Sequence, residues 1–319
     1  MAWPPYHLMA RDYLAEAKRK YERLERLYHV GHKQAWDGKQ LLGDLLKKHG
    51  GIRLAPEKKK ALAEIFSTIL WGELAAWSIS ADLALQIEDT EAKMAATSQV
   101  FDEARHFYTL RDYLLALDVE IPPLDGYTHT VLVELLDTHR LVDKLLGMQL
   151  IVESVAVTLF KTVAMARVEP VLSDLMSYFE RDEARHVGLG VLYLPKLLAT
   201  LGPIEAARLK VMQLKIVTLI GWGTHLKKPY FEELGIDNND SFRRGMRLNR
   251  EVMDGMRSAD REEPPGVLLG SAQAMRLNDW AIDLFFPRIG AELPAWQRAI
   301  VGVVDGLSKV GDRALRLAA

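Results

Sequence analysis

The chain of 319 residues contains no cysteine, which excludes disulfides, iron–sulfur clusters and metal sites built from thiolates. Absence of cysteine fits a cytoplasmic protein, and a cytoplasmic location is expected. The net charge is only −2, so nothing predicts a nucleic-acid partner. Glu, Lys, Arg or His interrupts every long apolar stretch, and no signal-peptide run follows Met1. Neither a membrane span nor a membrane partner is therefore expected.

Helix breakers are few, and no segment alternates apolar and polar residues as a half-buried strand does. The chain is therefore predicted to be all-α. Pro56 and Pro170 stand where a first-turn proline begins a helix. No stretch is a clear domain boundary, so residues 1–319 are predicted to form a single domain. Its core is expected at 57–200, with a helical extension at 1–56 and further helices at 201–319.

One pentapeptide, Asp-Glu-Ala-Arg-His, occurs twice, at residues 102–106 and 182–186. Each copy contains Glu-x-x-His, and residues three apart lie on the same face of a helix. Thirty residues before the glutamate of each copy stands another glutamate, Glu73 in one case and Glu153 in the other. The two halves of this pattern are thus offset by eighty residues.

Four carboxylates and two imidazoles on four helices are the ligand set of a di-iron or di-manganese carboxylate bundle. These ligand types suit iron and manganese. The predicted ligands, which are also the predicted catalytic residues, are Glu73, Glu103, His106, Glu153, Glu183 and His186.

The spacing of the ligands also fits two antiparallel helix hairpins. The midpoint between Glu73 and Glu103 falls beside the predicted turn at 89–90, and that between Glu153 and Glu183 falls beside 169–170. In both hairpins the ligands lie fifteen residues from the turn, or about 22 Å along the helices. Both hairpins should therefore place their ligands at the same height along the bundle axis.

The remaining residues of the pentapeptides are predicted to support the histidines. A histidine that binds a metal usually donates its other N–H to a carboxylate, which fixes the ring. Asp182 is the candidate partner of His106, and Asp102 is the candidate partner of His186. Arg105 and Arg185 would neutralise the two aspartates. Ordinary surface pairs between Asp and Arg are the alternative.

The doubled motif and the two upstream glutamates resemble the ferritin-like di-iron carboxylate superfamily over residues 57–200. Within it they are most similar to the catalytic chain of bacterial multicomponent monooxygenases, with ribonucleotide reductase small subunits and R2-like oxidases nearby. The resemblance implies a ferritin-like four-helix bundle with additional terminal helices. It also implies two iron ions, or a Mn/Fe pair, that activate O2 to hydroxylate, N-oxygenate or desaturate a small organic molecule.

Two positions depart from these families. Radical-bearing reductase subunits typically have a tyrosine one turn after the first histidine, where this chain has Leu110, and Tyr108 lies on another face. Monooxygenase chains typically have a threonine one turn after the third-helix glutamate, where this chain has Val157, followed by Thr158. A stable tyrosyl radical is therefore not expected.

Residues one helical turn from the ligands are expected to line an apolar substrate cavity or an O2 tunnel; plain bundle core is the alternative for each. The predicted lining residues are Ile69, Ala76, Trp77, Gln99, Leu110, Gln149, Leu150, Val157, Phe179 and Gly190. Glu180, one turn before Glu183, is a possible seventh carboxylate ligand, with a surface ion pair as the alternative.

The leading hypothesis is a non-haem di-iron oxygenase that acts on a small apolar or aromatic substrate with O2. An electron-donating reductase and a homodimeric assembly are also expected. Two alternatives stay open on the oxidoreductase side, an R2-like oxidase with Mn/Fe and a ferroxidase or iron-handling protein. A third alternative is a non-catalytic scaffold protein that has kept the ligand residues.

Overall fold

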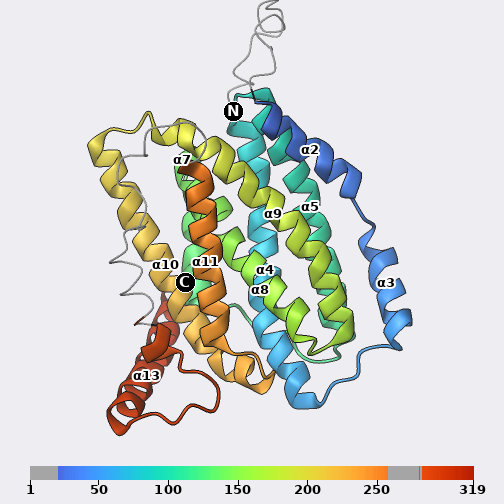
Figure 1. Ribbon diagram of the computed structural model, residues 1–319, viewed down its shortest axis with the longest axis vertical. Helices are drawn as coiled ribbons and strands as arrows, with labels where there is room; N and C mark the ends of the chain where they lie inside the picture. The colour runs from blue at the N-terminus through green and yellow to red at the C-terminus, as the bar shows by residue number, and fades with distance from the viewer. Residues whose placement is uncertain (1–20, 258–279, 281) are drawn as a thin grey trace, which may run out of the picture.

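In the computed structural model, residues 21–257, 280 and 282–319 are described, and within them helices are the only regular secondary structure (Figure 1). The all-α class predicted from the sequence is confirmed. The helices form a central bundle with further helices on two of its sides.

Two hairpins make the bundle. Helices α4 (Pro56–Gln86) and α5 (Thr90–Ala116) form the first. The second pairs α9 (Pro170–Leu198) with a composite helix that comprises α7 (Leu141–Lys144), η1 (Leu145–Val152) and α8 (Glu153–Ala166). The helices of each hairpin pack along each other, and α5 packs on α9 between the hairpins (Figure 1).

Local sequence explains where the bundle helices begin. Pro56 and Pro170 both occupy the first helical turn, where proline costs no backbone hydrogen bond. The side chain of Glu169 caps α9 by accepting hydrogen bonds from the backbone N–H groups of Val171 (3.1 Å) and Leu172 (2.7 Å). Both predicted helix starts are confirmed.

The third bundle helix, the composite of α7, η1 and α8, is not a uniform α-helix. Residues Leu145–Val152 form a π-helical segment that ends immediately before Glu153. Such wider turns are rare and occur mainly at functional sites. The segment changes the register of the residues that precede Glu153.

Flanking helices cover two sides of the bundle. Helices α2 (Glu22–Gln34) and α3 (Gly38–His49) lie against α5 and α9. On the other side lie α6 (Gly126–Asp137), α10 (Pro203–Glu233) and α11 (Asn238–Arg257). The last helix, α13 (Ala295–Ala318), packs on α6 and α10 (Figure 1).

The apolar interior is divided into two clusters along the bundle axis. On α4, one cluster takes residues up to Leu70 and the other begins at Ala75, with Glu73 between them. On α9, the division falls between Phe179 and Val187. Buried polar side chains therefore gather at one level of the bundle, between two apolar layers.

Two segments, Pro56–Gln86 and Leu141–Ala166, are long and apolar enough to cross a membrane by length and composition. They are two of the bundle helices, and 56% and 61% of their most apolar windows are buried inside the protein. Helices buried in a core carry apolar residues on most faces, which accounts for their composition.

Candidate metal centre

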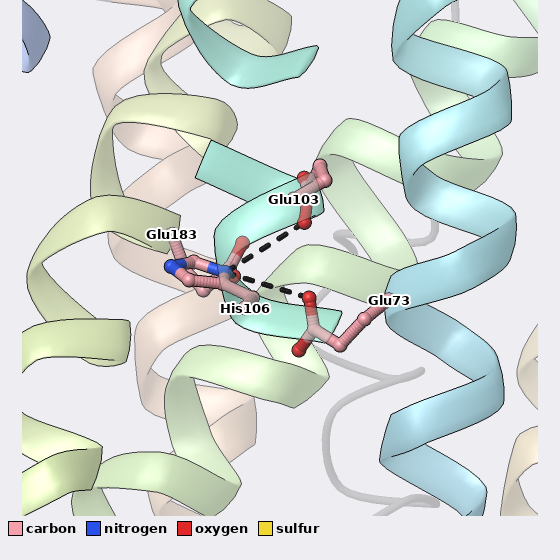
Figure 2. A group of neighbouring side chains, drawn as sticks. All are labelled: Glu73, Glu103, His106 and Glu183. Atoms are coloured by element: carbon pink, nitrogen blue, oxygen red, sulfur yellow. Dashed lines mark ion pairs between the residues drawn. The ribbon is translucent and has the colours of Figure 1, made fainter. Parts of the chain in front are cut away.

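The six predicted ligands meet at this polar level. The first group is Glu73, Glu103, His106 and Glu183, and the second is Glu103, Glu153, Glu183 and His186. Within each group the ligand atoms lie within 4.8 Å of one another, and all six residues are buried. Figure 2 shows the first group, which converges from α4, α5 and α9. Because Glu103 and Glu183 belong to both groups, the arrangement can hold two metal ions with two shared carboxylates.

Both histidines turn the same ring nitrogen toward the carboxylates. His106 Nδ1 lies 2.9 Å from Glu183 Oε1 and 3.4 Å from Glu73 Oε2. His186 Nδ1 lies 2.7 Å from Glu183 Oε2 and 3.1 Å from Glu103 Oε1. The Nδ1 atoms are therefore placed to bind metals, and the Nε2 atoms point away from the cluster.

Each Nε2 atom meets an aspartate from the opposite hairpin. His106 Nε2 lies 3.3 Å from Asp182 Oδ2, and His186 Nε2 lies 3.3 Å from Asp102 Oδ2. The structure therefore brings together the two crossed pairs that the sequence suggested. With the Nε2–H donating to a carboxylate, the ring presents the lone pair of Nδ1 to the cluster.

Two buried arginines pair with these aspartates. Arg105 donates to Asp102 (2.5 Å) and to Asp182 (2.7 Å), while Arg185 donates to Asp102 (2.8 Å). Arg185 also lies 2.9 Å from Asp182. Two aspartates and two arginines form a group without net charge. Burial alone would raise the pKa of Asp182, but His106 and Arg185 outweigh it and lower the pKa.

The four inner glutamates are compensated unequally from within the protein. Burial alone would raise the pKa of Glu103 and of Glu183, but the two histidines outweigh it and lower the pKa of both. Burial, opposed by the neighbouring imidazole of His106, raises the pKa of Glu73 well above its ordinary value. Burial and the charges of Glu183 and Glu103 do the same for the pKa of Glu153. Isolated buried carboxylates are costly. Two divalent cations would balance four carboxylates.

Several atoms in the cluster also lack a hydrogen-bond partner within the protein. They are Glu103 Oε2, His106 Nδ1 and Glu183 Oε1, all buried. Buried polar atoms are normally satisfied, so an unpartnered group calls for a ligand. These atoms point into the cluster and are of the types that bind iron or manganese. The residues present thus fit two metal ions.

Aromatic residues enclose one of the histidines. The Phe179 ring stacks on His106 with centroids 4.2 Å apart, and Trp36 lies on the same side at 6.1 Å. Trp36 Nε1 donates to Asp182 Oδ2 at 2.7 Å, so Trp36 and His106 share this carboxylate oxygen as a hydrogen-bond partner. Sequence reasoning missed Trp36, because it lies between α2 and α3 and has no counterpart in the other half of the repeat.

An amide pair supports the second group of ligands. Gln99 Nε2 donates to Glu103 Oε1 (2.9 Å) and to Glu153 Oε1 (3.0 Å). Gln149, on the π-helical segment, donates to Gln99 Oε1 at 3.1 Å. Among the described residues, no glutamine amide bonds to Glu73. The two predicted metal positions therefore differ in their surroundings.

A cavity of about 290 Å³ reaches the cluster from the side of α6, α10 and α11. Glu73 and Glu153 form part of its wall, so the cavity gives access to one ligand from each group. Most of the lining is apolar. Its apolar residues include Ile65, Ile69, Ala76, Val131, Leu132, Met148, Ile151, Leu159, Ile220 and Phe242.

Of the predicted lining residues, Ile69 and Ala76 line this cavity. The other eight are not among the residues that line this cavity, whose wall comes from α4, α6, η1, α8, α10 and α11. Gln99 and Gln149 bond to each other, and Phe179 packs on His106. Trp77 is 38% exposed, and the remaining four are buried elsewhere in the protein and are Leu110, Leu150, Val157 and Gly190.

Other positions named by the sequence lie outside the cluster. Glu180 is part-exposed, 3.9 Å from Lys161, and belongs to neither group of candidate ligands, so the ion-pair alternative fits it better. Tyr108 accepts a hydrogen bond from the backbone of Gly38. Thr158, rather than Val157, lines the cavity.

No protein-family model matches the sequence, and a search of curated proteins found no match. Solved structures of single-residue variants of an R2-like ligand-binding oxidase do match the fold. One with an aerobically reconstituted Mn/Fe cofactor has a TM-score of 0.54 at 18% identity, covering 79% of this chain and 97% of that chain. Another, reconstituted anaerobically, has a TM-score of 0.59 at 17% identity, covering 78% and 98%. At these identities the likeness establishes the fold, and the chain has the ferritin-like helical fold of those oxidases.

Proposed function

We propose that the protein is a non-haem di-metal oxidase that activates O2. Glu73 and His106 would hold one metal ion, Glu153 and His186 the other, and Glu103 and Glu183 would bridge them. The observation that carries the proposal is the pair of overlapping ligand groups beside a cavity that is lined in part by Glu73 and Glu153. Two redox-active metal ions held by these residues would supply the electrons for O2 reduction.

The shape of the site favours oxidation of an organic substrate over storage of iron. The cavity wall is mainly apolar, whereas a path for iron ions would need carboxylates along its length. The substrate class proposed is therefore a small apolar or aromatic molecule, which is hydroxylated, N-oxygenated or desaturated. A monooxygenase reaction is the first candidate.

The metal composition has two candidates. Two iron ions are the first candidate, since carboxylate and imidazole ligands suit iron as well as manganese. The solved structures with the same fold carry a Mn/Fe cofactor, which supports an R2-like oxidase with Mn/Fe as the second candidate. A reductase partner, a homodimeric assembly and a cytoplasmic location stay predictions, as does the single-domain organisation.

The protein's own residues would supply the positioning. Asp102 and Asp182 orient the two imidazoles, and Arg105 and Arg185 keep these aspartates ionised. Phe179 and the two apolar layers keep water from the cluster. Leu110 is fully buried and offers no phenol at the position where a radical tyrosine would stand.

The test is anaerobic reconstitution with ferrous iron alone or with manganese and iron together. Metal analysis, O2 uptake and optical and EPR spectra are then recorded. Two metal ions per chain and prompt O2 uptake are expected. Failure to react with O2 when both metals are bound would overturn the proposal, and a persistent tyrosyl signal in high yield would assign the protein to the radical-storing class.

A further inference from the structure

The last helix, α13, presents an apolar stripe to solvent. The first five residues of the stripe recur every three or four positions and the sixth follows two turns later; they are Trp296, Ile300, Val303, Leu307, Val310 and Leu317. Their exposed fractions include 59% for Trp296, 62% for Val303 and 68% for Val310. Scattered exposed apolar residues are ordinary, but a row of six along one helix face marks an interaction surface.

The opposite face of α13 is fixed to the protein, so the stripe cannot turn inward. Tyr127 Oη donates to the backbone carbonyl of Ser308 at 2.9 Å, and the backbone N–H of Gly126 donates to Asp312 at 2.6 Å. His225 lies 2.5 Å from Asp305. A Cβ atom on Gly311 would lie 2.1 Å from Tyr127 Oη, so this face is closely seated.

The charges along α13 are arranged asymmetrically. Its two acids, Asp305 and Asp312, are both engaged on the protein side, with His225 and with Gly126 and Arg316. Its four basic residues are all exposed and are Arg298, Lys309, Arg313 and Arg316. The helix therefore offers solvent an apolar row with basic residues beside it.

We propose that α13 docks on the surface of an anionic lipid bilayer. The apolar stripe would enter the headgroup boundary, and Lys309 and Arg313 would meet lipid phosphates. A strongly amphipathic helix with Trp and aliphatic residues on one face and Lys or Arg on the other is the usual form of an interfacial helix. A second copy of the chain fits less well, because two such helices would bring like charges together.

Docking in this way would place the cavity near the bilayer. Helices α6 and α10 carry α13, and both contribute residues to the cavity wall. A link between docking and uptake of an apolar substrate from the membrane rests on the proposed function. The docking itself does not, because it concerns a surface away from Glu73 and Glu153.

The experiment is sedimentation of the full chain with vesicles of phosphatidylcholine alone or mixed equally with phosphatidylglycerol. Binding to the mixed vesicles is expected, and it should weaken as salt is added. Val303→Asn with Leu307→Asn should weaken binding at least about tenfold. Lys309→Gln with Arg313→Gln should weaken it about thirtyfold, since each basic residue near an anionic surface contributes a roughly fivefold gain.

Leu115→Asn is the matched control, because Leu115 is 61% exposed and lies on α5, across the bundle from α13 (Figure 1). This variant should bind like the wild type. Absence of wild-type binding to the mixed vesicles overturns the proposal, and so does equal loss in the control. A dimer in free solution that the double Asn variant converts to monomer would assign the stripe to a second copy instead. Metal content and O2 uptake, measured on the same samples, test the oxidase independently.

Discussion

Asp182 Oδ2 lies 3.3 Å from Nε2 of His106, a residue seventy-six positions earlier in the chain and on the other hairpin. Asp102 and His186 repeat the contact in the opposite direction at the same distance. Each hairpin thus provides the residue that orients the histidine of the other. The two hairpins must be docked before either imidazole is held, so formation of the metal centre depends on assembly of the whole bundle.

Asp102→Asn and Asp182→Asn should therefore weaken metal retention. An amide cannot supply the charge that fixes the imidazole tautomer, and loss of such an outer partner typically costs about 10- to 100-fold in metal affinity or activity. Metal content after dialysis against a chelator measures the effect. Asp143→Asn is the control, because Asp143 is also a buried aspartate but lies outside the cluster. Wild-type retention in both test variants would contradict the role.

Gln99→Leu should affect the two metal positions unequally. The amide of Gln99 donates to Glu103 and Glu153, so its removal leaves carboxylates of the second group without that donor. A hydrogen bond to a charged group is worth about 1.5–3 kcal/mol. We expect occupancy to fall first at the position of Glu153 and His186. Metal-specific spectroscopy of partly loaded protein distinguishes the positions, and equal loss at both would argue against this asymmetry.

Asp174 on α9 forms ion pairs with the C-terminal end of α3. It lies 2.7 Å from Lys48, 2.8 Å from His49 and 2.6 Å from Arg167. The hydrogen bond from Lys48 is the main cause that lowers the pKa of Asp174 below its ordinary value of 3.8. A lowered folded-state pKa adds stability above the ordinary pKa, and this stability is lost as the pH falls through the folded value.

Asp174→Asn should therefore reduce the free energy of unfolding by about 1 kcal/mol at neutral pH, the upper end for a partly exposed ion pair. The difference between variant and wild type should shrink as the pH falls below 3.8. Urea unfolding at a series of pH values measures it. Asp112→Asn, which removes a partly exposed acid that pairs with Arg111, serves as the comparison. A difference that grows in acid would show that the ion pairs are not its source.

The repeated motif made the six candidate ligands predictable because each half of the repeat carries the same residues at the same helical spacing. The crossed aspartates were predictable for the same reason, since a histidine ligand needs an outer acceptor and the motif contains one candidate for each. The starts of α4 and α9 were predictable from proline. These features depend on local sequence and on the symmetry between the two hairpins.

The cavity and the amide pair depend on features without that symmetry. Spacing along a helix predicts the helix face on which a residue lies, but it does not predict which neighbouring helix packs against that face. Val157 and Leu150 are one turn from a ligand and yet lie in packed interior, whereas Thr158 faces the cavity. The π-helical segment shifts the helical register of the residues before Glu153, and the hydrophobic pattern of the sequence does not predict this segment. Trp36 reaches Asp182 from outside the repeat.

Gly72 offers a direct test of the cavity as the substrate site. It lies on α4 beside Glu73 and lines the cavity, and a Cβ atom built there meets no other atom within 4 Å. A phenylalanine side chain in Gly72→Phe should therefore fill part of the cavity without moving neighbouring atoms. The substitution also removes a glycine, which has a low helix propensity, from the interior of α4. We expect unchanged metal content and undiminished stability, with oxidation of an apolar probe such as toluene reduced at least about tenfold.

Gly43→Phe is the matched control, since Gly43 on α3 likewise has no atom within 4 Å of its Cβ position but does not line the cavity. It should oxidise the probe like the wild type. O2 uptake without the probe separates the two possible failures of Gly72→Phe. If uptake persists while probe oxidation is lost, the side chain has blocked the substrate and left the metals intact. Probe oxidation at the wild-type rate by Gly72→Phe would mean that the substrate reaches Glu73 and Glu153 by another route.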